Sequence, residues 1–305
     1  MDLEKILDIK YPIIQGGMAH IATGEFAAAV SNAGALGTIA SGAMSASDLN
    51  SEIKKCKMKT DNPFAVNLIM IRKEIKSLIE VILDNKVNIV TIGAGSPGRF
   101  LEILKKEGVK VLPVVSSPLQ ISRLEKSDCS AYIAEGMEAG GHIGHMTSMV
   151  LVPQAKDITK KPIICAGGIA SGKQMLAAEI LGAAGVQIGT GFLFTKECPI
   201  HENYKKKLIE SSSSKVTVIG KNKRIPIRLL KNNMTREYEK LERNYDFEQL
   251  ENFTVGRLKN AVVNGDIDDG SLMCGLTVGQ FDEIISVKDF IDKLIYEYEE
   301  AKNGN

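Results

Sequence analysis

The chain has 305 residues, of which 44% are hydrophobic and 25% charged, and its formal net charge is +1. This length allows one large α/β domain or two smaller ones, and the near-neutral balance gives no sign of a nucleic-acid partner. No apolar run reaches the roughly 18 residues of a membrane helix, and the five scattered cysteines form no C-x-x-C pair. The charged start "MDLEKILDIKYP" has no signal-peptide core, so we expect a soluble cytoplasmic protein without disulfides or membrane contact.

Short apolar runs followed by glycine-rich turns and amphipathic stretches recur every 20 to 30 residues. Eight of these runs are predicted strands: 12–17, 36–41, 64–69, 88–95, 109–115, 131–136, 162–168 and 185–190. Helical patterns lie between them, for example at 24–34, 72–85, 99–108 and 171–185. Near-continuous apolar strands that alternate with helices predict a parallel sheet. Eight such units favour a closed TIM (β/α)₈ barrel over a doubly wound sheet.

The strand–helix pattern ends after Thr195. Residues 197–270 are more polar, and an amphipathic helical pattern returns only at 288–301. We therefore expect a small subdomain inserted after strand 8, because a long loop without structure of its own is uncommon. The predicted division is a barrel of residues 1–196 and 271–305 with an inserted substrate or nucleotide subdomain of residues 197–270.

One stretch has the spacing of a dinucleotide fingerprint. In "IGAGSPG", residues 92–98, the glycines 93, 95 and 98 fit the pattern G-x-G-x-x-G. A dinucleotide fingerprint should open the first βαβ unit and be followed by an acidic residue about 20 positions later. This match falls in the fourth unit, and the next strand ends in "VVSSP". We interpret it as an ordinary turn between a strand and a helix.

The carboxyl ends of the predicted strands carry glycine, amide and carboxylate residues rather than a group of charges. Glycines allow a planar ligand to approach backbone N–H groups, and "AGGIASG" (166–172) with "QIGTGF" (187–192) occupies the strand positions that bind phosphate in many barrels. These features predict a phosphorylated cofactor. The candidate cofactor-binding residues are Gly16, Gly17, Met18, Ser41, Asn67, Glu135, Gly140, Gly141, Gly167, Gly168, Gln187, Gly189 and Thr190.

The loop after the sixth predicted strand, "EGMEAGGHIGHMTSM" (135–149), contains His142 and His145 among glycines. A histidine in this flexible setting at the catalytic face is a candidate proton donor near neutral pH, so we predict His142 as the catalytic residue. Two histidines three residues apart could also suggest a metal. However, the adjacent glycines argue against a helix with both on one face, and we predict no metal site.

Five stretches together resemble the nitronate monooxygenase family, most closely its enoyl-acyl-carrier-protein reductase II branch. They cover nearly the whole chain in order: "YPIIQGGMAHIATGEFAAAVSNAGALGTIASG", "PFAVNLI", "AEGMEAGGHIGHMTSMVLVPQ", "PIICAGGIASGKQMLAAEILGAAGVQIGTGFLFTKE" and "GDIDDGSLMCG". The resemblance implies a barrel that binds FMN at its mouth, with NADPH or NADH as hydride source and His142 as catalytic histidine. It implies FMN contacts from Gly17, Met18, Asn67, Glu135, Gly140, Gly168 and residues 187–190. It also implies a homodimer and a possible monovalent cation.

The branch of the family decides the expected substrate. Monooxygenase relatives often have Arg after the loop histidine, whereas this chain has Ile143, and His145 stands where relatives commonly have Lys or another residue. The stretch 224–239 resembles the reductase's inserted subdomain, and 270–275 resembles the segment that closes over its flavin. These similarities make Arg224, Arg228, Ser271, Met273 and His145 candidates for substrate or nucleotide contact.

A local excess of positive charge also favours the reductase. Between Ser211 and Thr235 there are six basic residues and no acidic one: Lys215, Lys221, Lys223, Arg224, Arg228 and Lys231. Such a run attracts anions, for example acidic acyl carrier protein, its phosphopantetheine, or the phosphates of NAD(P)H. We therefore expect reduction of trans-2-enoyl thioesters on acyl carrier protein. A nitronate monooxygenase that uses FMN and O₂ is the first alternative, and a non-catalytic flavin-binding barrel is the second.

Overall fold

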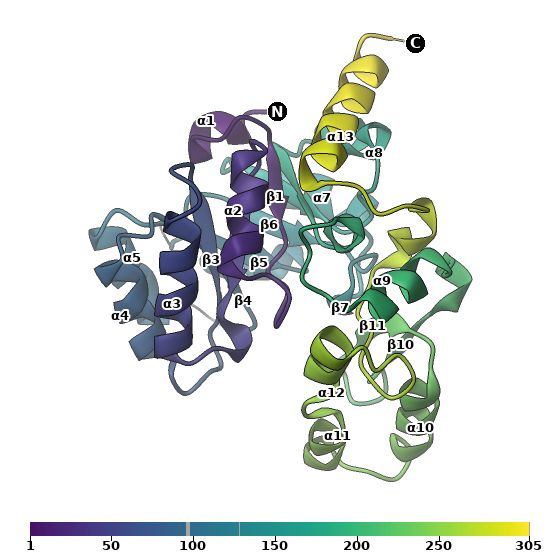
Figure 1. Ribbon diagram of the computed structural model, residues 1–305. Coiled ribbons are helices and arrows are strands. Elements are labelled where there is room, and N and C mark those ends of the chain that lie inside the picture. The colour runs from purple at the N-terminus through teal and green to yellow at the C-terminus, as the bar shows by residue number, and fades with distance from the viewer. Residues whose placement is uncertain (96–97, 128, 305) are drawn as a thin grey trace.

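The computed structural model describes residues 1–95, 98–127 and 129–304. Within these ranges, eight parallel strands form one sheet in the order β1-β9-β8-β6-β5-β4-β3-β2 (Figure 1). Each of the eight predicted apolar runs contains one of these strands. Their bounds are β1 Ile13–Gln15, β2 Gly37–Ala40, β3 Phe64–Ile69, β4 Ile89–Gly93, β5 Lys110–Val115, β6 Tyr132–Glu135, β8 Ile163–Ala166 and β9 Gly185–Ile188.

The two ends of this sheet meet, as a barrel requires. β1 pairs with β9 along its length, and on its other side Ile14 forms a parallel bridge with Leu36, next to β2. Gln15 N donates to Leu36 O over 2.9 Å, and Leu36 N donates to Ile13 O over 2.9 Å. The predicted (β/α)₈ barrel is confirmed, and the doubly wound alternative is wrong.

Helices cover the outside of the barrel because alternate strand residues face outward and are apolar. Ile163 and Cys165 of β8 pack in a cluster with helix residues, while Ile164 between them belongs to the cluster inside the barrel. The connecting helices are α2 Gly24–Asn32, α3 Ala46–Lys57, α4 Ile75–Asp84, α5 Gly98–Lys106, α6 Pro118–Leu124, α7 Ser148–Ile158 and α8 Gly172–Ile180. Polar side chains fix several starts; Ser45, for example, caps α3 in a reciprocal box with Asp48.

A short helix that the sequence pattern did not predict closes the amino-terminal end of the barrel. In α1, Leu3–Leu7, both leucines are buried in the inner cluster with Ile14, Ile89 and Ile164. Leu3 N donates to Ala184 O, and Lys110 Nζ donates to Ile6 O, so α1 is held on two sides of the barrel. Ligands can therefore approach the barrel interior only from the opposite end.

Residues 197–270 contain more regular structure than the sequence pattern indicated. They form the helices α9 Glu202–Ile209, α10 Asn233–Leu241, α11 Phe247–Thr254 and α12 Arg257–Lys259, and the antiparallel hairpin β10 Val216–Ile219 and β11 Ile227–Leu230. Figure 1 shows α10, α11 and α12 grouped below the barrel, away from α1. The boundaries predicted for an inserted subdomain remain a prediction.

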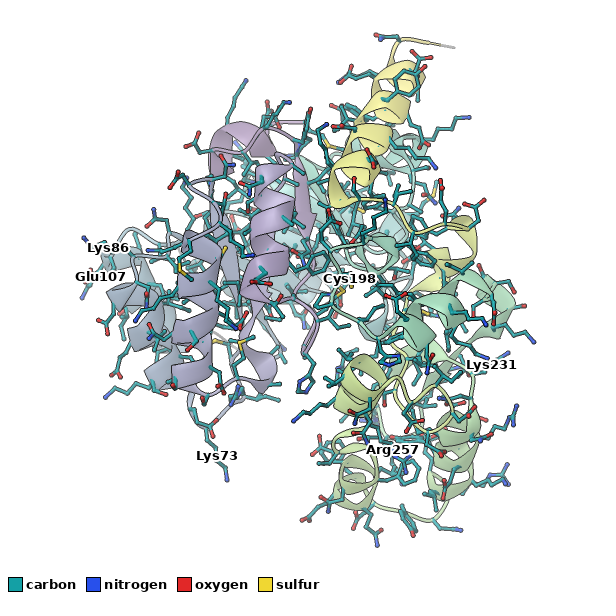
Figure 2. All side chains as sticks on the ribbon, viewed as in Figure 1. Lys73, Lys86, Glu107, Cys198, Lys231 and Arg257 are labelled. Carbon is teal, nitrogen blue, oxygen red and sulfur yellow. The ribbon has the colours of Figure 1, made fainter. Side chains whose placement is uncertain are left out.

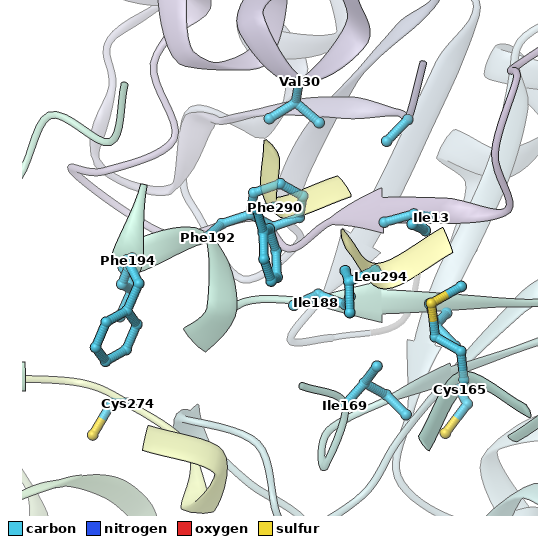
Figure 3. Close-up of a cluster of buried hydrophobic side chains, with 14 of the residues drawn as sticks. Ile13, Val30, Cys165, Ile169, Ile188, Phe192, Phe194, Cys274, Phe290 and Leu294 are labelled. Atoms are coloured by element: carbon cyan, nitrogen blue, oxygen red, sulfur yellow. The ribbon is translucent and has the colours of Figure 1, made fainter. Parts of the chain in front are cut away.

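The last helix, α13 Val287–Lys302, contacts α8 and α2, as the returning amphipathic pattern predicted. Its Phe290 meets Phe192 edge to face, with ring centroids 5.2 Å apart. Figure 3 shows both rings between Val30 and Ile188, close to Leu294. This aromatic packing joins the end of the chain to the segment directly after β9, at the side of the barrel mouth.

The G-x-G-x-x-G stretch lies between a strand and a helix of the fourth unit, as we interpreted it. β4 ends at Gly93 and α5 begins at Gly98, while residues 96–97 lie outside the described residues. Gly95 has φ +115°, a conformation that glycine adopts readily. None of the three glycines lines the pocket described below.

Candidate active site

The mouth of the barrel has a polar inner layer directly above an apolar one. Ala65, Ile89 and Ile133 belong to the inner apolar cluster. Because side chains alternate along a strand, the residues two positions later, Asn67, Thr91 and Glu135, face the same interior nearer the mouth. Asn67 pairs in register with Thr91, and its Nδ2 donates to Thr91 Oγ1 over 2.9 Å. The strand periodicity therefore ends in groups that can bind a polar ring.

A pocket of about 540 Å³, measured with its open side, lies above this layer. Most of the predicted cofactor-binding residues line it: Gly16, Gly17, Met18, Glu135, Gly140, Gly167, Gly168, Gln187, Gly189 and Thr190. The other three candidates border it. Ser41 donates its hydroxyl to Asn67 O over 2.7 Å, the Asn67 side chain lies under Gly17, and Gly141 follows Gly140. The structure thus brings the predicted set together at one place.

Two glycine turns present amide groups to one side of this pocket. Gly167 and Gly168, after β8, have φ values of +89° and +79°, which L side chains rarely adopt. In the described part of the chain, the amide nitrogens of Gly168 and Gly189 donate no hydrogen bond to a protein atom. Unengaged N–H groups at the mouth ends of adjacent strands are suited to bind a phosphate.

Close backbone contacts shape the rest of the pocket. A Cβ atom on Gly17 would lie 2.5 Å from Asn67 Cγ, and one on Gly140 would lie 2.6 Å from the carbonyl carbon of Cys274. Gly275 N donates to Thr190 Oγ1 over 2.7 Å, and Leu276 N donates to Glu138 O over 3.0 Å. The segment around residue 275 is therefore fixed across the pocket rim, and neither glycine can carry a side chain.

Two carboxyl groups line the pocket in different states. Burial raises the pKa of Glu135 to about 7, so its protonated and ionised forms both exist near neutral pH. Glu138 instead accepts hydrogen bonds from Ser148 N, at 2.9 Å, and from Ser148 Oγ, at 3.1 Å. Ser148 Oγ also lies 2.9 Å from Gly167 O, so Glu138 connects the loop after β6 to the glycine turn after β8.

His142 lies in a short strand and not in a flexible loop as expected. β7, Gly141–His142, pairs antiparallel with β11, with Gly141 opposite Arg228 and His142 opposite Ile227. Ile143 N extends this contact by donating to Pro226 O over 3.0 Å. The imidazole is accessible to solvent, yet surrounding protein lowers the pKa of His142 through desolvation, with Glu251 acting in the opposite direction. The ring is therefore mostly neutral at pH 7.

Arg228 is buried, unlike the surface cation that the basic run predicted. Its side chain is 6% exposed, and its Nε and Nη2 both donate to Met137 O, at 3.1 and 2.8 Å. No ion pair joins Arg228 to a carboxylate among the described residues. Met137 N in turn donates to Met146 O over 2.7 Å. Arg228 thus holds the loop that leads to His142, and its contact with substrate or nucleotide remains a prediction.

The other candidates lie in several places. Ser271 and Met273 line a second, apolar pocket together with His142. Arg224, exposed and with φ +62°, lies in the turn of the β10–β11 hairpin near Lys221 and Lys223. Lys231 is exposed at the other end of the hairpin, and Figure 2 shows it at the periphery of the molecule. His145 is exposed and lines neither pocket.

The sequence interpretation missed many residues that line the two pockets, and three polar ones among them bear on the chemistry of the site. Glu138 follows Glu135 by three positions in "EGMEAGG", so a second acid among glycines was its signal. Thr277 follows "GSLMCG" by two residues and completes the rim of the first pocket. Glu251 lies on α11 beside His142, and no pattern in the sequence connects these two residues.

Two kinds of feature are absent from the residues that the structure describes. These residues contain no helix that is long and apolar enough to cross a membrane. They also contain no group of three or more His, Cys, Asp or Glu residues placed to hold a metal ion.

A family model and several known proteins resemble this chain over most of its length. The model described as nitronate monooxygenase matches residues 1–78 and 70–297. The structure of FabK from Thermotoga maritima is 42% identical with a TM-score of 0.96, and the match covers 99% of this chain and 96% of that chain. A probable nitronate monooxygenase of Staphylococcus saprophyticus is 32% identical, and the match covers 70% of this chain and 73% of the relative.

A third relative acts on a coenzyme A thioester. It is the (3aS,4S,5R,7aS)-5-hydroxy-7a-methyl-1-oxo-octahydro-1H-indene-4-carboxyl-CoA dehydrogenase of Rhodococcus jostii. The two sequences are 26% identical, and the match covers 96% of this chain and 94% of the relative.

The raised pKa of Glu135 makes the stability of the ligand-free protein depend on pH. The folded protein keeps this proton up to about pH 7, whereas the unfolded chain loses it near pH 4.5. The contribution of Glu135 to stability is therefore greatest below pH 4.5 and falls as pH rises toward 7. We expect Glu135→Gln to reduce the loss of unfolding free energy between pH 4.5 and pH 7 by up to about 3 kcal/mol. Urea unfolding of both proteins at several pH values measures it, and equal pH dependence in the two proteins contradicts the assignment.

Replacement of Arg228 leaves Met137 O without its two donors. We expect Arg228→Met to lower the free energy of unfolding by about 2 kcal/mol, the usual cost of a buried carbonyl that loses a charged donor. Hydrogen exchange should also become faster at the amides of residues 137–146. Lys221→Met, an exposed change in the same hairpin, is the matched control and should alter neither quantity. Unchanged exchange in Arg228→Met would show that Arg228 does not hold this loop.

Proposed function

Because the chain belongs to the nitronate monooxygenase family of flavin-dependent oxidoreductases, we propose that it is an FMN-dependent enoyl-acyl-carrier-protein reductase driven by NADPH or NADH. The observation that carries this proposal is the match to FabK at 42% identity over 99% of the chain. That match includes the hairpin that holds the His142 loop. The thioester chemistry of the Rhodococcus jostii relative also supports an acyl thioester substrate.

The residues at the mouth fit FMN. The unengaged amides of Gly168 and Gly189 suit its phosphate, and the contact between Gly17 and Asn67 leaves a flat surface where a ring system can lie. Asn67, Glu135 and Gln187 can hydrogen-bond to the polar edge of the ring. When bound, FMN supplies the hydride transfer between the nicotinamide and the β-carbon of the enoyl thioester.

His142 is the proposed proton donor to the α-carbon of the substrate. Its backbone is positioned by the β7–β11 pairing rather than by a mobile loop, so the residue lies beside the apolar pocket before substrate binds. The lowered pKa of His142 means that the protonated ring is the minor form at neutral pH, and that transfer from it is correspondingly favourable.

Acyl carrier protein is the proposed partner. Lys215, Lys221, Arg224 and Lys231 are exposed around the hairpin, and opposite charge steers an acidic carrier toward that surface. The hairpin also lines the second pocket beside His142, so a carrier bound there delivers its thioester over a short path.

The alternative function is a nitronate monooxygenase, which oxidises alkyl nitronates with FMN and O₂. The family model and the Staphylococcus saprophyticus relative favour it. Ile143, which follows the loop histidine where monooxygenase relatives often have Arg, argues against it. Enzyme relatives over most of the chain argue against a non-catalytic barrel.

An anaerobic titration separates these functions. We expect NADPH or NADH to bleach the flavin of the purified holoenzyme within a single fast phase, and crotonyl thioester to restore its colour. Stopped-flow absorbance measures both steps. Bleaching by an alkyl nitronate, with none by either nicotinamide, would contradict the reductase and favour the monooxygenase.

Substitution of the loop histidine tests the proposed proton transfer. We expect His142→Ala to retain FMN while turnover falls by roughly 10²-fold, the usual scale of general acid catalysis. Because burial lowers the pKa of His142, wild-type turnover should decline as pH rises through a value below 6.5, and the variant should lack this decline. Steady-state rates across pH measure this, and unchanged turnover in His142→Ala removes the residue from the mechanism.

A further inference from the structure

We propose that the apolar pocket beside His142 binds the hydrocarbon chain of the acyl substrate. This inference rests on the proposed function, because it names where the chain of an enoyl thioester lies. The pocket encloses about 660 Å³ and is separate from the cofactor pocket, although the loop after β6 contributes to both.

Two structural elements, β11 and α11, supply about half of the residues that line the pocket. Ile227 and Leu229, alternate residues of β11, lie on the strand face opposite to buried Arg228, and they share that face with His142 across the β7 pairing. From α11, Leu250 and Thr254 lie one helical turn apart and complete the opposite wall. Strand and helix thus present apolar side chains to the pocket from two sides.

The polar groups at this pocket select against charged or heteroaromatic ligands. Glu251 lines the same wall, and its carboxylate repels the phosphates of a nucleotide and the anionic head of a nitronate. Apart from Glu251, the polar side chains in the lining are those of His142, Tyr238, Thr254 and Ser271. A planar base would need several hydrogen-bond partners, whereas a hydrocarbon chain needs only apolar surface.

The position of His142 connects the two pockets. Gly140 lines the cofactor pocket, and His142, two residues later, lines the apolar one. Met273 bridges the same boundary, because it pairs with Leu229 and its Sδ lies 3.5 Å from where a Cβ of Gly141 would be. A thioester with its reacting carbons beside His142 therefore has its chain directed between β11 and α11.

Phe247 marks the open side of this pocket. Its ring is 44% exposed, although it belongs to the same helical face as Leu250 and Thr254. A bound acyl chain that extends past the pocket would cover this exposed ring, so chains of different lengths can be accommodated.

Saturated acyl-pantetheine ligands test this assignment without turnover, because they carry no double bond to reduce. We expect affinity for the holoenzyme to rise about threefold to fourfold for each methylene added between four and ten carbons, the increment for burial of a CH₂ group. Isothermal titration calorimetry measures it. An affinity that does not change with chain length overturns the pocket assignment.

A substitution that fills the pocket provides the second measurement. We expect Thr254→Trp to remove the methylene increment and to lower kcat/KM for a ten-carbon enoyl thioester by at least tenfold, with crotonyl thioester changed less than twofold. Asn252→Trp, an exposed position on α11 that does not line the pocket, is the matched control and should leave both substrates unchanged. If Thr254→Trp instead raises KM for NAD(P)H alone, the pocket binds the nucleotide and the proposal is wrong.

These outcomes distinguish the pocket from the proposed function. If the holoenzyme shows the methylene increment but reduces no enoyl thioester, the pocket assignment stands and the reductase function is wrong. If the protein reduces enoyl thioesters but its rates and affinities do not depend on chain length, in wild type or in Thr254→Trp, the reductase function stands and the pocket assignment is wrong.

Discussion

The organisation of the active site depends on one antiparallel pairing of two residues, β7 with β11. It joins the loop after β6, which contributes to both pockets, to a hairpin more than 80 positions later in the chain. The pairing is too short to be stable alone, and the two hydrogen bonds from Arg228 to Met137 O reinforce it from the buried face. A single hairpin therefore sets the position of His142 and forms a wall of the apolar pocket.

Neutral hydrogen-bond donors and fixed positive charges lie in different parts of the site. The glycine turns offer neutral amides to a phosphate inside the mouth, while the exposed lysines of the hairpin lie outside it. Inside, the charge of Glu135 is disfavoured by burial and that of Glu138 is met by Ser148. A site built in this way can bind a charged cofactor tightly without placing strong fixed cations beside the reacting carbons.

The sequence predicts the barrel and its mouth well because both follow from periodicity. Buried parallel strands are nearly continuous apolar runs, and their carboxyl ends must meet at one side, which brings Gly17, Glu135 and Gln187 together. The pairing of His142 with Ile227 has no periodic signal, because two residues are too few to show one. Arg228 within a basic run resembles a surface residue, and only the fold reveals the carbonyl that it serves.

The closed end of the barrel has a kinetic consequence. Leu3 and Leu7 fill the side opposite the mouth, so every molecule that reaches Glu135 must enter and leave through the same opening. Under the proposed reductase function, the nicotinamide and the acyl thioester both need this opening and exclude each other. Their steady-state rates should then follow a ping-pong law, in which a large excess of either reactant inhibits by occupying the enzyme form that the other requires.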